Sequence, residues 1–328
     1  MTDNPSRPLP SREALTICFA HPAYRMAERF AARETGIRHI EVRSLEALQA
    51  RLPEAQVLVV SGLWRNELAA APRLAFIQSI SAGVDQYDRQ ALADAGIRLA
   101  SAQGANERAV AEHAIALMLA LARKLPTARD NQAARRWRGL VSTIEQREDE
   151  LAGKTLVIVG MGRIGSRLAR LAQAFDMRVV GVKRDASRGA DAADRVVPTA
   201  RLLEALSQAD YVALTCPLTE QTRNLIDARA FAALRPGACL VNVARGAVVD
   251  EAALVQALQQ GRLAAAAVDC VQEEPLAPSS PLWTVDNLLI TPHSAGETRR
   301  YEDNVIDLLL ENLQRLWSGN PDLKNAIV

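Results

Sequence analysis

The sequence predicts an α/β protein of two domains, each a doubly wound parallel sheet with helices on both faces. Three observations lead to this fold class. The chain has 328 residues, more than one hydrophobic core of ordinary size needs. Short apolar runs alternate along it with helical patterns, as they do in parallel α/β proteins. A glycine-rich turn, GMGRIG at 160–165, separates one such run from the helical pattern that follows it.

The first part of the chain forms one α/β unit. Its expected strands are LTICFA (15–20), AQVLVVS (55–61) and LAFIQSIS (74–81), and its expected helices are MAERFAARETG and LEALQARL. A long helix should run from Asn106 to about Leu125, because Asn is a good N-cap and apolar residues recur at helical spacing after it. Residues 126–150 read as a polar, arginine-rich connection.

A second and more regular series begins after that connection. The expected strands are KTLVIVG (154–160), MRVVGV (177–182), RVV (195–197), DYVALT (210–215), ACLVNV (238–243), AAAAVD (264–269) and NLLIT (287–291). Helical patterns lie between most of them. This series predicts a doubly wound sheet of six or seven strands.

Composition narrows the function. The formal net charge is +1, so no global field favours nucleic acid or a membrane surface as a partner. The cysteines Cys18, Cys216, Cys239 and Cys270 lack paired or metal-ligand spacing, which fits reduced thiols and no metal site. The polar start lacks an apolar signal core, and no run is long enough to span a bilayer. We expect a cytoplasmic protein that acts on small molecules.

The glycine-rich turn carries the first chemical signal. Gly160, Gly162 and Gly165 directly follow a predicted strand and open a predicted helix. Glycines there allow a tight turn and a close backbone approach to a pyrophosphate, whose charge the helix N-terminus favours. A bland glycine turn is the alternative, but the strand-turn-helix setting favours dinucleotide binding.

A basic pair follows the next strand. NAD sites usually carry an acidic residue there, which accepts a hydrogen bond from the ribose 2′-hydroxyl and would repel a 2′-phosphate. Here the position holds Lys183, and Arg184 can offer a planar fork to phosphate oxygens. The pair therefore favours NADP(H), with NAD(H) possible. A solvated surface pair is the alternative, with Asp185 serving the ribose instead.

Three polar residues follow later strands. Arg245 comes after ACLVNV, Glu274 lies in the loop after AAAAVD, and His293 follows NLLIT. Because ligands of open α/β sheets bind outside the carboxyl ends of the strands, these loops can converge. Arg can grip a carboxylate with two hydrogen bonds, His can exchange a proton near neutral pH, and Glu can orient the His.

These motifs together resemble the D-isomer-specific 2-hydroxyacid dehydrogenases, which include glyoxylate/hydroxypyruvate reductases and D-3-phosphoglycerate dehydrogenases. The resemblance covers nearly the whole chain, through SAGVDQYD (81–88), GANERAVAEH (104–113), GMGRIG (160–165), CPLTEQTRNLI (216–226), NVARGAVVDE (242–251), DCVQEEPL (269–276), SPLWTVDNLLITPHSAG (280–296) and NAIV (325–328). It implies an NAD(P)-dependent oxidoreductase that interconverts 2-oxo acids and D-2-hydroxy acids. With the basic pair, we expect an NADPH-preferring reductase of the glyoxylate/hydroxypyruvate type.

The resemblance also assigns site residues. It implies that Arg245 binds substrate, that Glu274 supports His293 and that His293 is the acid/base. Cofactor contacts are implied for Arg163 with the pyrophosphate and Asp269 with the nicotinamide carboxamide. The remaining expected cofactor residues are Ile164, Cys216, Pro217, Thr222, Val243 and Ala244. The substrate carboxylate is expected on the amides of Ala82, Gly83 and Val84, with Trp64 either walling the pocket or simply packed.

The domain layout follows from the same resemblance. Two Rossmann-like or flavodoxin-like domains are implied, with the cofactor domain (105–296) inserted in a substrate domain made of 1–104 and 297–328. The helix from Asn106 and the arm after it resemble dimerisation elements, so a homodimer through the nucleotide-binding domains is expected. His113, within that helix, is interpreted as a structural hydrogen-bonding residue.

Departures and alternatives remain open. Lys183 replaces the family's common acidic residue, and Cys270-Val271 replaces its usual Val-Phe. Corepressors of the C-terminal-binding-protein type resemble the family and keep the Arg-Glu-His set, so a nucleotide-sensing interaction protein is the alternative from another class. Within the enzymes, D-3-phosphoglycerate dehydrogenase is an alternative. Formate dehydrogenases, with Gln at the site of Glu274, and phosphite dehydrogenases, with a Lys near IQSISAG, are disfavoured.

Overall fold

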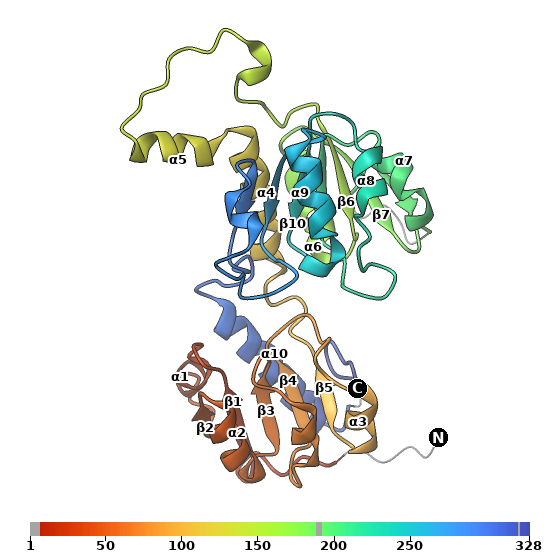
Figure 1. The fold of residues 1–328 in the computed structure, drawn as a ribbon. Helices are drawn as coiled ribbons and strands as arrows, with labels where there is room; N and C mark the ends of the chain where they lie inside the picture. The colour runs from red at the N-terminus through yellow and green to blue at the C-terminus, as the bar shows by residue number, and fades with distance from the viewer. Residues whose placement is uncertain (1–6, 188–191, 321) are drawn as a thin grey trace. The chain divides into compact units, whose positions relative to one another are not determined.

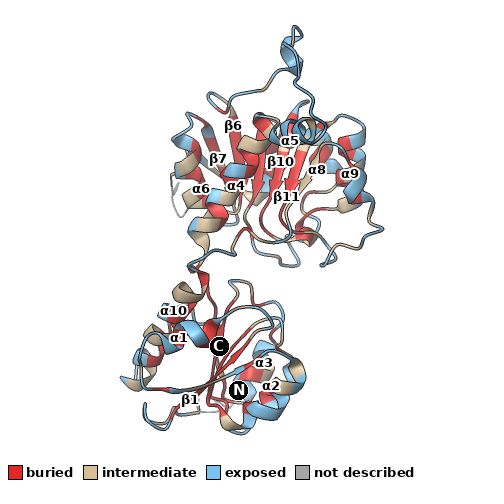
Figure 2. Ribbon diagram, turned by 90° about the vertical axis from the view of Figure 1, so that its left-hand side faces the viewer, coloured by how far each residue is buried: buried red, intermediate tan, exposed pale blue. Residues whose placement is uncertain are grey.

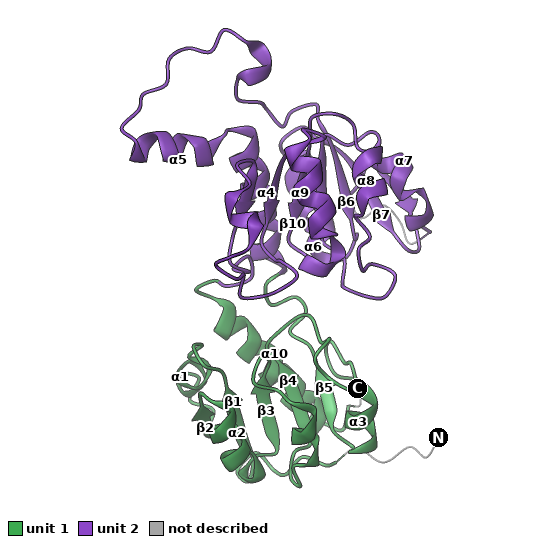
Figure 3. Cartoon of the chain, viewed as in Figure 1, with its two compact units in different colours: residues 1–106, 298–328 green, residues 107–297 purple. Residues whose placement is uncertain are grey.

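The computed structural model describes residues 7–187, 192–320 and 322–328. The chain divides into two compact units (Figure 3). Unit 1 comprises residues 1–106 and 298–328, and unit 2 comprises residues 107–297. The chain therefore crosses between the units after residue 106 and again after residue 297.

Unit 1 is a five-stranded parallel sheet in the order β2-β1-β3-β4-β5 (Figure 1). Its strands are β1 (Thr16–Ala20), β2 (Arg38–Val42), β3 (Val57–Val60), β4 (Phe76–Ser79) and β5 (Arg98–Ala100). Its α-helices are α1 (Met26–Ala31), α2 (Leu45–Arg51), α3 (Arg89–Asp94) and α10 (Tyr301–Trp317). The central strands are buried throughout, so both faces need cover: α1 and α10 pack on one face, α2 and α3 on the other.

The sequence pattern missed two strands of this sheet, β2 and β5. Both are edge strands. β2 mixes exposed and half-buried residues and therefore lacks the continuous apolar run of a central strand, and β5 has only three residues. The C-terminal segment protects the edge beyond β5, where the Leu99 amide donates to the Val328 carbonyl and the Ile327 amide donates to that of Leu99.

Unit 2 is a seven-stranded parallel sheet in the order β12-β11-β10-β9-β6-β7-β8, within the six or seven strands expected. Its strands are β6 (Thr155–Val159), β7 (Arg178–Lys183), β8 (Arg195–Pro198), β9 (Tyr211–Leu214), β10 (Ala238–Asn242), β11 (Leu263–Val268) and β12 (Leu288–Ile290). Its α-helices are α4 (Glu107–Ala122), α5 (Leu125–Ala133), α6 (Arg163–Gln173), α7 (Leu202–Leu206), α8 (Ala228–Ala233) and α9 (Glu251–Gln259).

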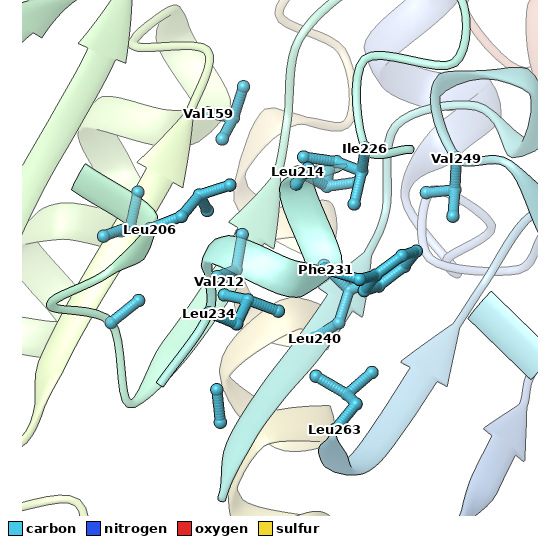
Figure 4. Packing of buried hydrophobic residues seen from close by; sticks show 14 of the residues in the cluster. Val159, Leu206, Val212, Leu214, Ile226, Phe231, Leu234, Leu240, Val249 and Leu263 are labelled. Atoms are coloured by element: carbon cyan, nitrogen blue, oxygen red, sulfur yellow. The ribbon is translucent and has the colours of Figure 1, made fainter. Parts of the chain in front are cut away.

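Helices cover both faces of this sheet, and the central strands β6, β9 and β10 between them are almost entirely buried (Figure 2). Residues of α4 and α6 pack on one face, and residues of α7, α8 and α9 pack on the other. Figure 4 shows part of the core on the side of α7, α8 and α9, where Phe231 of α8 lies near Leu240 of β10 and the loop residues Ile226 and Val249. This burial on two faces explains why the central strands of unit 2 are near-continuous apolar runs and could be read from the sequence.

The long helix is shorter than expected. α4 ends at Ala122, and Lys124 then takes a left-handed backbone conformation, with φ of 50°, which stops the helix before Leu125. A second helix, α5, follows in the segment that the sequence had indicated as a connection. α5 buries none of its residues in this chain, so it lacks the apolar stripe by which a helix is usually recognised.

The order of the strands determines where a ligand can bind. The chain passes from β6 outward to β7 and β8 and then returns to β9 on the other side of β6. In open α/β sheets this reversal opens a crevice beyond the carboxyl ends of the strands. None of the helices in the described parts of the chain has the length and apolar character needed to cross a membrane.

Candidate active site

The glycine-rich turn after β6 brings three backbone segments into close contact. Gly160 has φ of 106°, and a Cβ there would lie 2.5 Å from the Cys216 amide nitrogen. A Cβ on Gly165 would lie 2.2 Å from the Gly160 carbonyl oxygen. Both positions therefore require glycine. The Thr215 hydroxyl, which the sequence had not singled out, donates to the Gly160 carbonyl over 2.7 Å and ties the turn to the end of β9.

The third glycine faces open space. No heavy atom of the described chain lies within 4 Å of a Cβ built on Gly162, the exposed N-cap of α6, and no described side chain caps this end. Unsatisfied amides at a helix N-terminus attract anions. The turn thus fits a dinucleotide pyrophosphate, with Arg163 exposed and Ile164 half-buried in the first turn of α6.

The loop after β9 contains three more of the expected cofactor residues. Cys216 is buried, and burial raises the pKa of its thiol to about 11, so the thiol is neutral at physiological pH. The Thr222 hydroxyl donates to the Pro217 carbonyl over 2.7 Å and accepts from the Thr219 amide. Thr222 therefore shapes this loop, and contacts of the three residues with a cofactor remain a prediction.

The basic pair lies at the end of β7. Lys183 is the last residue of the strand and is half-buried, whereas Arg184 is exposed. Asp185 is also exposed, and its Oδ1 accepts hydrogen bonds from the amide and the hydroxyl of Ser187. Lys183 therefore occupies the strand end where the ribose-binding carboxylate of an NAD site usually lies.

Arg245 follows β10 and is held by a buried asparagine. Asn242, 1% exposed, accepts from the Ala244 amide and donates to the Arg245 carbonyl, so it fixes the backbone that carries the guanidinium. Val243 and Ala244 are buried beside it. The sequence had not singled out Asn242; its signal was a polar residue at the end of an otherwise apolar strand.

Glu274 and His293 form a pair between the loops after β11 and β12. Glu274 Oε2 lies 2.7 Å from His293 Nδ1, and Glu274 Oε1 accepts from the Val271 amide over 3.0 Å. Partial burial opposes ionisation of Glu274, but the hydrogen bonds from His293 and Val271, with the charges of His293 and Arg245, outweigh it and lower its pKa. An ionised Glu274 thus orients an imidazole that is 44% exposed.

Gly246 couples the arginine loop to the glutamate loop. A Cβ at this position would lie 1.9 Å from the Val271 carbonyl carbon and 2.3 Å from the Gln272 amide nitrogen. Two further bonds hold Gln272: its amide donates to Glu251, and its side chain donates to the Val249 carbonyl. The loop that carries Glu274 therefore rests directly on the backbone that follows Arg245.

Asp269 lies at the centre of the loops that follow β11 and β12. It is 2% exposed, and it accepts hydrogen bonds from the Thr291 hydroxyl and from the amides of Ser294 and Ala295. The carboxylate thus holds the segment around His293. Its expected contact with the nicotinamide carboxamide remains a prediction.

The other expected substrate residues belong to unit 1. Ala82, Gly83 and Val84 follow β4; Ala82 is exposed and Val84 is buried. Trp64 is 3% exposed, donates its indole N–H to Asn66 and packs against Tyr87 with ring centroids 5.5 Å apart. Trp64 therefore contributes to the core of unit 1, and substrate contacts of these residues stay predictions.

Comparison with known proteins identifies relatives of this arrangement. The family model for the NAD binding domain of D-isomer specific 2-hydroxyacid dehydrogenases matches residues 115–295. A glyoxylate reductase of Aeropyrum pernix is 37% identical over 267 residues, which cover 80% of this chain and 79% of the relative. A D-3-phosphoglycerate dehydrogenase of Archaeoglobus fulgidus is 34% identical over 305 residues, which cover 90% of this chain and 56% of the relative.

A solved structure shows the same architecture over nearly the full chain. It is a D-isomer specific 2-hydroxyacid dehydrogenase family protein from Aeromonas salmonicida, with 30% identity and a TM-score of 0.84. The match covers 96% of this chain and 99% of that one. By contrast, the chain spans about half the length of the phosphoglycerate dehydrogenases that it matches.

We expect Gly246→Ala to separate the arginine and glutamate loops, because the added methyl group would overlap the Val271 carbonyl. Overpacking of this kind costs about 1–3 kcal/mol of the free energy of unfolding, which denaturant titration measures. Gly62→Ala is the matched control, since a Cβ built there meets no described atom within 4 Å beyond its chain neighbours. Equal stability of the two variants would contradict the close contact.

Proposed function

Because the chain belongs to the D-isomer specific 2-hydroxyacid dehydrogenase family, we propose that it reversibly reduces a 2-oxo acid to the D-2-hydroxy acid with a nicotinamide cofactor. One observation carries the proposal: His293 Nδ1 lies 2.7 Å from Glu274 Oε2, and the positive charge of Arg245 helps to lower the pKa of Glu274. A proton donor, a carboxylate that supports it and a cation for an anionic substrate are the groups that this reaction needs.

Each residue then has a defined task. Arg245 grips the substrate carboxylate through two hydrogen bonds and polarises the neighbouring carbonyl, with the amides of 82–84 assigned to the same carboxylate by the family resemblance. Protonated His293 gives its proton to the carbonyl oxygen, and ionised Glu274 stabilises the imidazolium before transfer. A reduced nicotinamide, when bound, supplies hydride to C2.

The residues at the turn after β6 would hold the cofactor. Backbone amides at the start of α6 would bind the pyrophosphate, with Arg163 beside them. Lys183 and Arg184 at the end of β7 support NADPH as the preferred form, because both can bind a 2′-phosphate and neither repels it. Asp185, whose Oδ1 already accepts from Ser187, is less suited to the ribose.

The substrate is proposed to be a small 2-oxo acid of the glyoxylate or hydroxypyruvate type. Similarity to a glyoxylate reductase over most of its length supports this class, and similarity to phosphoglycerate dehydrogenases keeps the phosphorylated analogue as the second candidate. Assays of glyoxylate, hydroxypyruvate, pyruvate and phosphohydroxypyruvate with NADPH and NADH would rank them. Nucleotide binding without turnover on any of them would favour the interaction-protein alternative.

We also propose a homodimer that forms through unit 2. Among the large hydrophobic residues exposed in the described chain, four of seven lie in one segment: Leu125, Trp137, Leu140 and Ile144. Trp137 and Leu140 are almost fully exposed, which is unusual for large apolar side chains gathered in one arm. A second copy of this chain is the expected cover. Cytoplasmic location and the lack of nucleic-acid and membrane partners stay predictions.

Replacement of His293 by Ala should lower kcat by several orders of magnitude and leave nucleotide affinity nearly unchanged, because the proton moves only in the reaction. In Glu274→Gln the imidazolium loses its anionic partner, so His293 should lose its proton at a lower pH. Reduction, which needs that proton, should therefore fail at a lower pH than in the parent protein. Steady-state rates across pH test both variants. Near-normal turnover of His293→Ala, or an unchanged profile of Glu274→Gln, would overturn the assignment.

The wild-type protein should prefer NADPH, and the preference should weaken as salt rises because Arg184 is exposed. Each charge-assisted contact is worth about 1.5–3 kcal/mol, so losing one should weaken NADPH binding roughly ten- to a hundredfold. Lys183→Asp with Arg184→Ala should reverse the ratio of kcat/KM for the two cofactors at one fixed salt concentration. A parent that prefers NADH, or a ratio that does not move, would mean that the pair does not read the phosphate.

Trp137→Glu with Leu140→Glu should convert a dimer into monomers, because two charges would enter an apolar interface. Light scattering after size exclusion gives the mass of each species. Trp283→Glu is the control: this tryptophan is 55% exposed but lies outside the arm, so the variant should remain dimeric. A monomeric parent, or a double variant that still dimerises, would contradict the proposed interface.

A further inference from the structure

The loop that carries His293 has an unfavourable backbone conformation. His293 has φ of 55°, in the left-handed region, although it has a full side chain. Such a conformation is unfavourable for a non-glycine residue, because its Cβ lies too close to the following carbonyl oxygen. It persists only when surrounding contacts fix the backbone more strongly than the residue resists it. Side chains of neighbouring elements must therefore hold residues 291–295, the histidine loop, in this conformation.

Asp269 supplies most of the restraint. The Thr291 hydroxyl lies 2.6 Å from its Oδ1, and the Ser294 and Ala295 amides lie 2.9 and 3.0 Å from its two oxygens. These bonds reach the loop on both sides of His293. Hydrogen bonds to a carboxylate are stronger than those between neutral groups, so three of them together can hold one residue in the left-handed conformation.

A second histidine completes the network from a distant part of the sequence. His113 Nε2 lies 3.0 Å from Thr291 Oγ1 and 3.5 Å from Asp269 Oδ1. Because the Thr291 hydroxyl gives its proton to Asp269, its oxygen is left to accept a hydrogen bond from His113 Nε2–H. The bond orients the hydroxyl toward the carboxylate.

Helix α4 presents His113 to this loop. Ala111 and Ala114 are fully buried on the helix, and α4 packs against β10 and β11. Small side chains on the buried face let the helix lie close to the sheet. His113 itself is only 24% exposed and remains within reach of the residues that follow β12.

We propose that His113 is a positioning residue for His293. Through Thr291 and Asp269 it holds the histidine loop in the conformation that places the His293 ring on Glu274. The catalytic consequence rests on the proposed function, whereas the structural consequence does not. Asp269 then has a structural role as well. Its two oxygens can accept roughly four hydrogen bonds, and three of these come from the histidine loop.

The structural test uses imidazole NMR signals, because the chain has only four histidines and each can be assigned by one substitution. His113→Phe keeps a ring of similar size but removes the donor. We expect the His293 signals to shift or broaden as its ring loses a single orientation. His113→Gln, whose amide can donate to Thr291, should restore them. His39→Phe, in unit 1, is the control and should leave the His293 signals unchanged.

The kinetic test separates positioning from binding. Misplacing a reacting group by a fraction of an ångström to one ångström costs on the order of tenfold to a hundredfold, so kcat of His113→Phe should fall by about that factor. KM for the oxo acid should stay within about twofold, since Arg245 is untouched. His113→Gln should recover most of kcat. Loss of KM alone, or equal rates in Phe and Gln variants, would overturn the proposal.

A second pair of variants guards against misfolding of the first. Thr291→Val removes the hydroxyl, whereas Thr291→Ser keeps it. We expect the His293 signals and kcat to change in the Val variant and to remain near wild type in the Ser variant. If His293 signals in Thr291→Val match those of the parent, the network does not position the ring. Absence of turnover in the wild type would reject the proposed function, and the NMR comparison would still decide the positioning role.

Discussion

Close backbone contact between successive loops, at the carboxyl edge of the seven-stranded sheet, is the constraint on which the candidate site depends. Gly160 lies against Cys216, and Gly246 lies against Val271, so neither contact leaves room for a Cβ. A parallel sheet brings all these loops to one edge, but contacts of this kind determine how the loops are positioned relative to one another. The contact of Gly246, next to Arg245, with Val271, three residues before Glu274, therefore determines where both side chains lie.

Two carboxylates near this edge do different work because their partners differ. Asp269 is buried and accepts hydrogen bonds from two backbone amides and a hydroxyl, so its carboxylate stabilises the conformation of the histidine loop. Glu274 is partly exposed, and one of its oxygens is used by the imidazole of His293. Glu274 can therefore respond to the protonation of the ring, whereas Asp269 sets where the ring lies.

The sequence predicted what depends on local pattern and missed what depends on tertiary contact. Central strands and the glycine turn were readable because burial on two faces demands apolar runs and the turn demands glycine. Edge strand β2 and helix α5 have no such requirement, since each leaves much of its surface unburied within this chain, and β5 has only three residues, too few for a recognisable apolar run. Thr215 and Thr291 gain their roles from residues distant in sequence, which no spacing reveals, whereas Asn242 bonds the backbone two and three residues later.

The strand order also separates two properties of the proposed enzyme. His293 follows β12 at one edge of the sheet, whereas Lys183 ends β7 near the other, with β11, β10, β9 and β6 between them. In the proposed mechanism, proton transfer depends on a hydrogen-bonded pair inside a tightly packed set of loops, where small displacements are costly. In the same proposal, discrimination between cofactors depends on Lys183 and Arg184 at the end of β7, one of them half-buried and the other exposed. The proposal therefore assigns cofactor preference and proton transfer to different strands of the sheet, so a shared reaction among relatives carries little information about which nucleotide each one uses.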